Sequence, residues 1–124
     1  MHYKLAILLN DIAQIEYDRS VPLESRQADH LSNMDKKMAN GFSLGEKQIN
    51  DPDQGQKAEF VASNLYHAIK GDNEAMASAM TSYLAVYIAD LKQVKFDDKD
   101  GEVSIELVYD KEYTNQVGVQ FTTH

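Results

Sequence analysis

The chain has 124 residues, no cysteine and a formal net charge of −8 at neutral pH. This is the usual length of one domain, and without cysteine the chain has no disulfide, no thiol nucleophile and no cysteine-bound metal. Because an acidic chain repels phosphate, the charge disfavours nucleic acid and anionic membranes as partners. No apolar run approaches the roughly 20 residues that cross a bilayer.

Residues 3–17 carry apolar side chains at three- and four-residue steps, which predicts a first amphipathic helix. These side chains are Leu5, Leu8, Leu9, Ile12 and Ile15. A second helix is expected over Leu23–Ala39, because Pro22 suits a first helical turn and Asn40-Gly41 is a good stop. Its apolar stripe is thin and consists of Leu31, Met34 and Met38. A stripe of this kind suits a helix at the edge of the molecule, or one that completes its burial against another chain.

Two further helices are predicted between Asp51 and Leu91. Asp51 and Pro52 suit the start of the third, and Gln54 stands where a capping box has its glutamine. Asp72 is expected to cap the fourth. Since only Gly71-Asp72 separates the two, we expect them to be antiparallel neighbours in a helical hairpin.

The apolar period changes to two after the last helix, which predicts strands. Asp100-Gly101 between two alternating runs is a strong hairpin signal. A second turn is expected over residues 110–115, before a third alternating run. The alternating apolar positions are Val94 and Phe96, then Val103, Ile105, Leu107 and Tyr109, then Val117, Val119 and Phe121. Three strands with short links predict an antiparallel meander.

These elements together predict an α+β fold in two layers, with four helices followed by a three-stranded antiparallel β-meander. The helices are expected to cover the apolar face of the meander. We expect one domain over residues 1–124, with its helical part at 1–91 and its meander at 92–122.

Two short motifs resemble catalytic or metal sites but lack the rest of the required pattern. Residues 41–45 match G-x-S-x-G, which in hydrolases lies on a turn from a strand into a helix, whereas a helix is expected before it here. Residues 98–101 match the middle of a calcium-binding loop, but its first and last ligands would be Phe96 and Leu107. No two histidines stand three or four residues apart. We therefore expect no catalytic residue, no metal site and no cofactor.

Two groups of residues remain as candidates for binding. Tyr83, Tyr87 and His67 are candidates to line a ligand pocket between the fourth helix and the sheet. A partner surface is expected from the thin stripe, Leu31, Met34 and Met38, and from Asp97, Asp98 and Asp100. The stretch from Asp97 to Glu112 holds seven acidic residues and two lysines, so it would suit a basic partner.

The sequence favours a non-enzymatic protein-interaction module, such as an accessory, regulatory or chaperone-like subunit in the cytoplasm. Its partner would be another protein or a second copy of the chain in a homodimer. The alternative is a small-molecule binding protein or minor enzyme that uses the pocket of Tyr83, Tyr87 and His67. The small size, the acidic second half and the missing catalytic pattern favour the first hypothesis.

Overall fold

The structure, a computed structural model, describes residues 4–114. Six strands and three helices follow one another in this part of the chain. They are β1 (Lys4–Leu9), β2 (Ile12–Asp18), α1 (Ser25–Ala39), β3 (Phe42–Leu44), β4 (Lys47–Ile49), α2 (Gln54–Lys70), α3 (Glu74–Tyr87), β5 (Gln93–Lys99) and β6 (Glu102–Val108). None of these three helices has the length and apolar character that crossing a bilayer requires.

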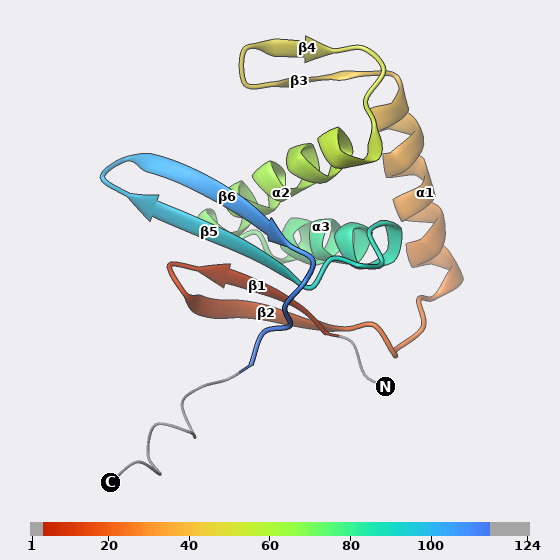
Figure 1. Ribbon diagram of the computed structural model, residues 1–124. Helices are drawn as coiled ribbons and strands as arrows, with labels where there is room; N and C mark the ends of the chain where they lie inside the picture. The colour runs from red at the N-terminus through yellow and green to blue at the C-terminus, as the bar shows by residue number, and fades with distance from the viewer. Residues whose placement is uncertain (1–3, 115–124) are drawn as a thin grey trace, which may run out of the picture.

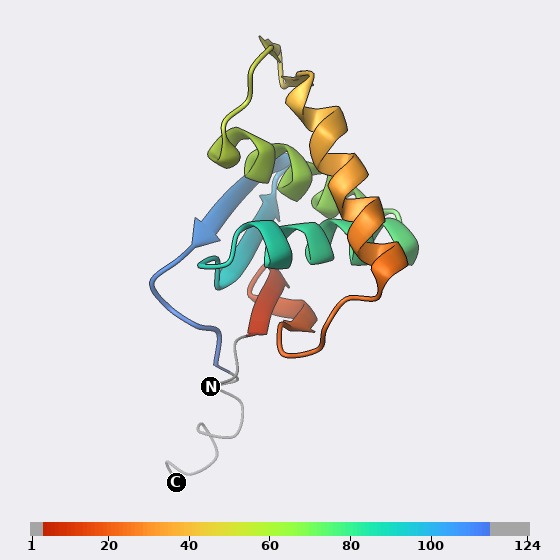
Figure 2. The same ribbon diagram turned by 90° about the vertical axis from the view of Figure 1, so that its right-hand side faces the viewer.

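Four of the strands form a mixed sheet in the order β2-β1-β5-β6. The central pair, β1 and β5, is parallel, and each of them is antiparallel to its own hairpin partner. The helices lie on one face of this sheet (Figures 1 and 2), and the small β3–β4 hairpin stands apart from it. The molecule is therefore a two-layer α+β fold, as expected, with a different set of elements.

The prediction of four helices followed by a three-stranded meander is wrong, because residues 4–18 form two strands. β1 is a central strand that is buried on both faces, and Leu5, Ala6, Ile7 and Leu8 are each at most 4% exposed. A strand of this kind is apolar throughout and has no period of two, so it can imitate the spacing of a buried helix. Asn10 and Asp11 make the turn to β2, with φ angles of 51° and 68°.

The helix boundaries differ from the predicted ones by a few residues, because neighbouring polar side chains serve as the caps. α1 begins at Ser25 with Glu24 as its N-cap, so Pro22 precedes the helix and does not stand in its first turn. Asp53 caps α2 and forms the capping box with Gln56, two residues later than expected. Asn73 caps α3, which ends at Tyr87. The expected pairing of α2 with α3 is present, and the two helices lie side by side (Figure 1).

The hairpin of β5 and β6 is confirmed, and its turn consists of Asp100 and Gly101. Both turn residues have positive φ angles, 56° and 79°, which is the geometry that matches the twist of paired strands. The predicted third strand, with Val117, Val119 and Phe121, lies outside the described residues.

The core lies between the helices and one face of the sheet. The sheet contributes Leu5, Ile7, Val94 and Phe96, and the helices contribute Leu31, Val61, Leu65, Tyr83 and Leu84, all of which are at most 2% exposed. Just after β2, the guanidinium of Arg19 donates hydrogen bonds to the carbonyls of Ala85 and Ile88, at 3.1 and 3.0 Å. A cation at the carbonyl end of a helix is favourable, so this contact holds β2 against α3.

Candidate functional site

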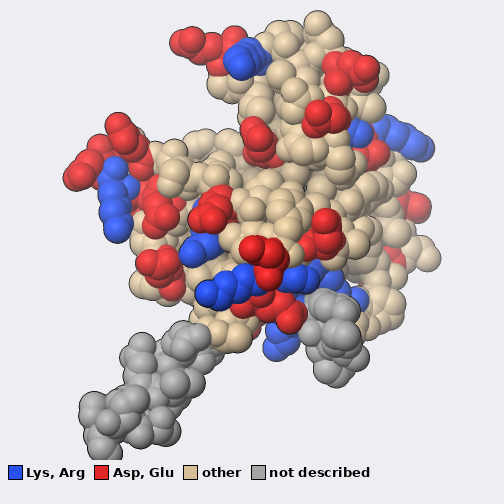
Figure 3. Space-filling model, viewed as in Figure 1, with Lys and Arg blue, Asp and Glu red and all other residues tan. Residues whose placement is uncertain are grey.

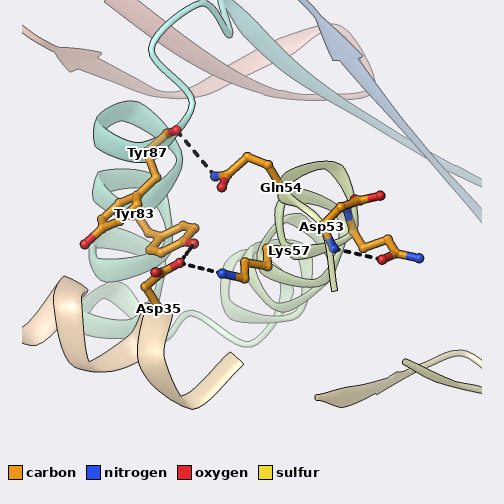
Figure 4. Close-up of polar contacts among 7 residues, drawn as sticks. Asp35, Asp53, Gln54, Lys57, Tyr83 and Tyr87 are labelled. Carbon is orange, nitrogen blue, oxygen red and sulfur yellow. Dashed lines mark hydrogen bonds and ion pairs between the residues drawn. The ribbon is translucent and has the colours of Figure 1, made fainter. Parts of the chain in front are cut away.

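The two tyrosines predicted for a ligand pocket belong to a polar cluster among the helices (Figure 4). The Tyr83 hydroxyl donates a hydrogen bond to Asp35 Oδ1 on α1 at 2.6 Å, and Lys57 Nζ on α2 lies 3.1 Å from the same oxygen. The Tyr87 ring stacks on the Tyr83 ring with their centroids 4.5 Å apart. Tyr83 therefore points toward α1 and α2, and the pocket expected between this helix and the sheet is not where its hydroxyl lies.

This cluster is internally satisfied. The hydrogen bond from Tyr83 is the largest cause that lowers the pKa of Asp35; burial opposes it and Lys57 adds to it. Burial, followed by the hydrogen bond to Asp35, raises the pKa of Tyr83. Among the described residues, no buried side-chain nitrogen or oxygen lacks a hydrogen-bond partner. The cluster thus joins three helices, and none of its buried polar side-chain atoms is left unpaired.

The third residue of the predicted pocket, His67, is exposed on α2. Its ring lies edge-on to the neighbouring Tyr66, with centroids 5.4 Å apart. Its ring contact is thus with the preceding residue in the chain and not with Tyr83 or Tyr87. The structure does not bring the three residues of the predicted pocket together.

The predicted partner stripe on α1 lies mostly in the core. Leu31 and Met38 are 2% and 6% exposed, and the half-buried Met34 packs against the same core. These side chains complete their burial within the chain. The thin stripe indicates a helix that contacts the rest of the molecule along a narrow line.

The acidic residues predicted for a partner surface have separate environments. Asp98 accepts hydrogen bonds from Asn10 Nδ2 and the Tyr66 hydroxyl, both at 2.8 Å, and forms an ion pair with Lys70 at 3.0 Å. The bond from Asn10 is the largest cause that lowers the pKa of Asp98 to about 2. Asp97 lies on the opposite face of β5, since side chains alternate along a strand, and Asp100 lies in the turn. Within residues 4–114, no three histidine, aspartate or glutamate side chains gather as metal ligands would.

The candidate site that the structure reveals is the outer strand of the second hairpin, β6. In the part of the chain that the structure describes, β6 has a neighbouring strand on one side only. Val103 and Ile105 are 46% and 38% exposed, although Ile105 pairs with the buried Phe96 and shares its face of the sheet. An edge strand presents unpaired backbone N–H and C=O groups. This edge combines those groups with an open apolar face.

A groove runs along the apolar face of β6. Its volume is about 490 Å³, and it is lined by Ile105 and Leu107 of the strand, Glu59 and Ser63 of α2, and Leu44 of the β3–β4 hairpin. The wall opposite the strand comes from α2 and the small hairpin, which projects beyond the sheet (Figure 1). The groove therefore has an apolar floor and one acidic side chain at its border.

The other face of β6 is charged. Glu102 pairs across the strands with Lys99, and Glu106 pairs with Lys95, so each glutamate stands directly opposite a lysine of β5. Figure 3 shows acidic and basic side chains together at the tip of this hairpin, on the left of the view. The charged face of β6 thus carries the acidic side chains, and the lysines that pair with them lie on β5.

Sequence reasoning identified the acidic turn but did not identify this edge. The alternation of Val103, Ile105 and Leu107 predicted an apolar face, which was expected to be covered by helices. Alternation along a strand shows which side chains share a face, but not how far the covering layer extends over it. Comparison of the chain with protein-family models, with curated proteins and with solved structures found no match.

Proposed function

We propose that this chain is a protein-interaction module that binds an extended segment of another protein along β6. The observation that carries the proposal is the exposure of Val103 and Ile105 on an edge strand, 46% and 38% respectively. Exposed apolar edge strands invite pairing with other chains, and proteins usually blunt or cover them. Addition of a strand to such an edge is a common mode of peptide recognition, in which the backbone supplies affinity and side-chain pockets supply specificity.

The groove beside β6 supports this mode of binding. An added strand would place alternate side chains over the floor formed by Ile105 and Leu107, with Leu44 and Ser63 at the border. The same strand would bring its backbone to the open hydrogen-bonding edge. One extended segment would therefore satisfy both features, whereas a globular surface would reach the backbone edge less completely.

The proposal is tested by affinity capture of the tagged full-length chain from its native cell extract, with variants that separate the two edges of the sheet. Ile105→Lys introduces a charge on the apolar face of β6. Ile12→Lys is the matched control, because Ile12 is 66% exposed on the opposite edge strand, β2. We expect a protein that co-purifies in stoichiometric amount with the wild type and the control, and is lost with Ile105→Lys.

Retention of that protein by Ile105→Lys would contradict the proposal, as would the capture of no protein that depends on β6. Circular dichroism of both variants shows whether each is folded. Because both isoleucines are already exposed, each substitution is expected to leave the fold intact.

A further inference from the structure

The cross-strand pairs on the charged face of the second hairpin suggest which segment would fit β6. On β5, Lys95 and Lys99 stand opposite Glu106 and Glu102 of β6. Opposite charges directly across a strand pair are stabilising, and like charges are destabilising. Each of these rows therefore alternates in sign from β5 to β6, and no strand within residues 4–114 occupies the next position outward.

We propose that β6 selects a basic extended segment, with lysine or arginine opposite Glu102 and Glu106 and apolar residues opposite Val103, Ile105 and Leu107. This inference rests on the proposed function and specifies the partner for it. Because strands pair residue by residue, the two basic residues stand four positions apart in the partner. Apolar side chains occupy the alternate positions, where they face the groove.

The surroundings of β6 favour the same sign of charge in the partner. Glu59 borders the groove on the apolar side of the edge. The turn at one end of β6 contains Asp100, and Asp110 and Glu112 follow its other end. A basic segment would meet acidic side chains at both ends of the strand and at the groove.

Charge also argues against a second copy of β6 as the occupant. An antiparallel copy would bring its acidic turn beside Asp110 and Glu112 of the first chain, and would add its own Glu102 and Glu106 to the same edge. The net charge of −8 on each chain adds to this repulsion at low salt. A basic partner removes the repulsion that a copy would create.

The test measures binding of three labelled peptides to the full-length chain by fluorescence anisotropy. The peptides, VKVTVKV, VTVTVTV and VEVTVEV, share an alternating pattern and differ only at their second and sixth residues, and each has a Gly-Ser flank for solubility. We expect the lysine peptide to bind roughly 3- to 30-fold more tightly than the threonine peptide, and the glutamate peptide to bind most weakly. The preference should shrink as salt is raised.

Charge reversal of the edge provides the decisive variant. In Glu102→Lys/Glu106→Lys the order of the three peptides should reverse. Glu16→Lys/Asp29→Lys changes the net charge by the same amount at exposed positions on β2 and α1, and should keep the wild-type order. N-methylation of alternate backbone positions in the lysine peptide should abolish binding for one of the two sets, because only one set pairs with β6.

The outcomes separate the inference from the proposed function. Equal binding of the three peptides, or an unchanged order in Glu102→Lys/Glu106→Lys, overturns the basic partner and leaves strand addition standing. Failure of every peptide to bind overturns both. In that case, sedimentation of wild type and Ile105→Lys would show whether a second copy occupies the edge.

Discussion

The two hairpins of the sheet share their turn geometry and differ in what covers their outer strands. Asn10-Asp11 and Asp100-Gly101 both turn through two residues with positive φ angles, and the two hairpins are joined through the parallel pairing of β1 with β5. On β2, Ile15 and Tyr17 pack against the core. On β6, Val103 and Ile105 remain 46% and 38% exposed.

Both outer strands contact a helix. α3 contacts β2, and Arg19 bonds that edge to the carbonyls of α3. α2 contacts β6 as well, but Leu107 at the end of the strand is half-buried while the residues before it are open. The helical layer thus covers Ile15 and Tyr17 on β2 and leaves Ile12 at the start of that strand exposed, whereas on β6 it covers only Leu107. An edge left open in this way is suited to an added strand.

The largest expected effect contrasts two isoleucines on the same face of the sheet. Ile7 on β1 is fully buried, whereas Ile105 on β6 is 38% exposed. Ile7→Ala should lower the free energy of unfolding by about 2–5 kcal/mol, because it leaves a cavity in the core. Ile105→Ala should cost about 1 kcal/mol or less, because much of that side chain is already in water.

Urea unfolding of the wild type and the two variants measures both values. Equal losses from the two substitutions would show that β6 is covered in solution, and would remove the contrast between the edges. If Ile105→Ala lowered the free energy of unfolding only when a partner is bound, the contrast between the buried Ile7 and the exposed Ile105 would be sharper.

A smaller effect is expected where the tips of the two hairpins meet. Asn10 of the first hairpin holds Asp98 of the second, and the pKa of Asp98 lies at about 2, below its usual 3.8. A carboxylate with a lowered pKa stabilises the folded state above its unfolded pKa, and this stability is lost as the pH falls toward its folded pKa. Asp98→Asn should therefore be less stable than wild type at pH 6, and the difference should shrink between about pH 4 and pH 2.

The measurement is urea unfolding of both proteins across this pH range, so that titration of the other carboxylates cancels in the difference. Asp97→Asn is the matched control, because Asp97 is the adjacent residue on the opposite face of β5. A difference between wild type and Asp98→Asn that stays constant with pH would contradict the role given to the Asn10 contact.

The sequence predicted the second hairpin and the helices but not the first hairpin, for a physical reason. Val103 and Ile105 alternate with charged or polar residues because β6 has one wet face, and such a strand shows its period directly. β1 is central and buried on both sides, so its apolar run carries no period. The parallel pairing of β1 with β5 joins segments more than 80 residues apart, which no local pattern records.

The edge strand β6 lies within the acidic stretch that the sequence indicated as a partner surface, but its exposed apolar face was not predicted. The acidic stretch from Asp97 to Glu112 indicated a basic partner, and that expectation stays a prediction. Asp98, however, is held by Asn10, Tyr66 and Lys70, contacts between distant elements that spacing cannot reveal. The exposure of Val103 and Ile105 depends on where α2 lies over the sheet, which is also a property of the packed molecule.

The smallest expected effect concerns the two turns themselves. Gly101 has a φ of 79° and no atom within 4 Å of an added Cβ, so Gly101→Ala would cost only the left-handed backbone penalty of about 1 kcal/mol. Asp11 has a φ of 68°, and Asp11→Gly should leave stability within about 0.5 kcal/mol of wild type, because relief of that strain offsets the added freedom of the unfolded chain. Thermal unfolding of the two variants gives both numbers. A large loss for Asp11→Gly would mean that its side chain, and not only its backbone, holds the first hairpin, and the two turns would then no longer be equivalent.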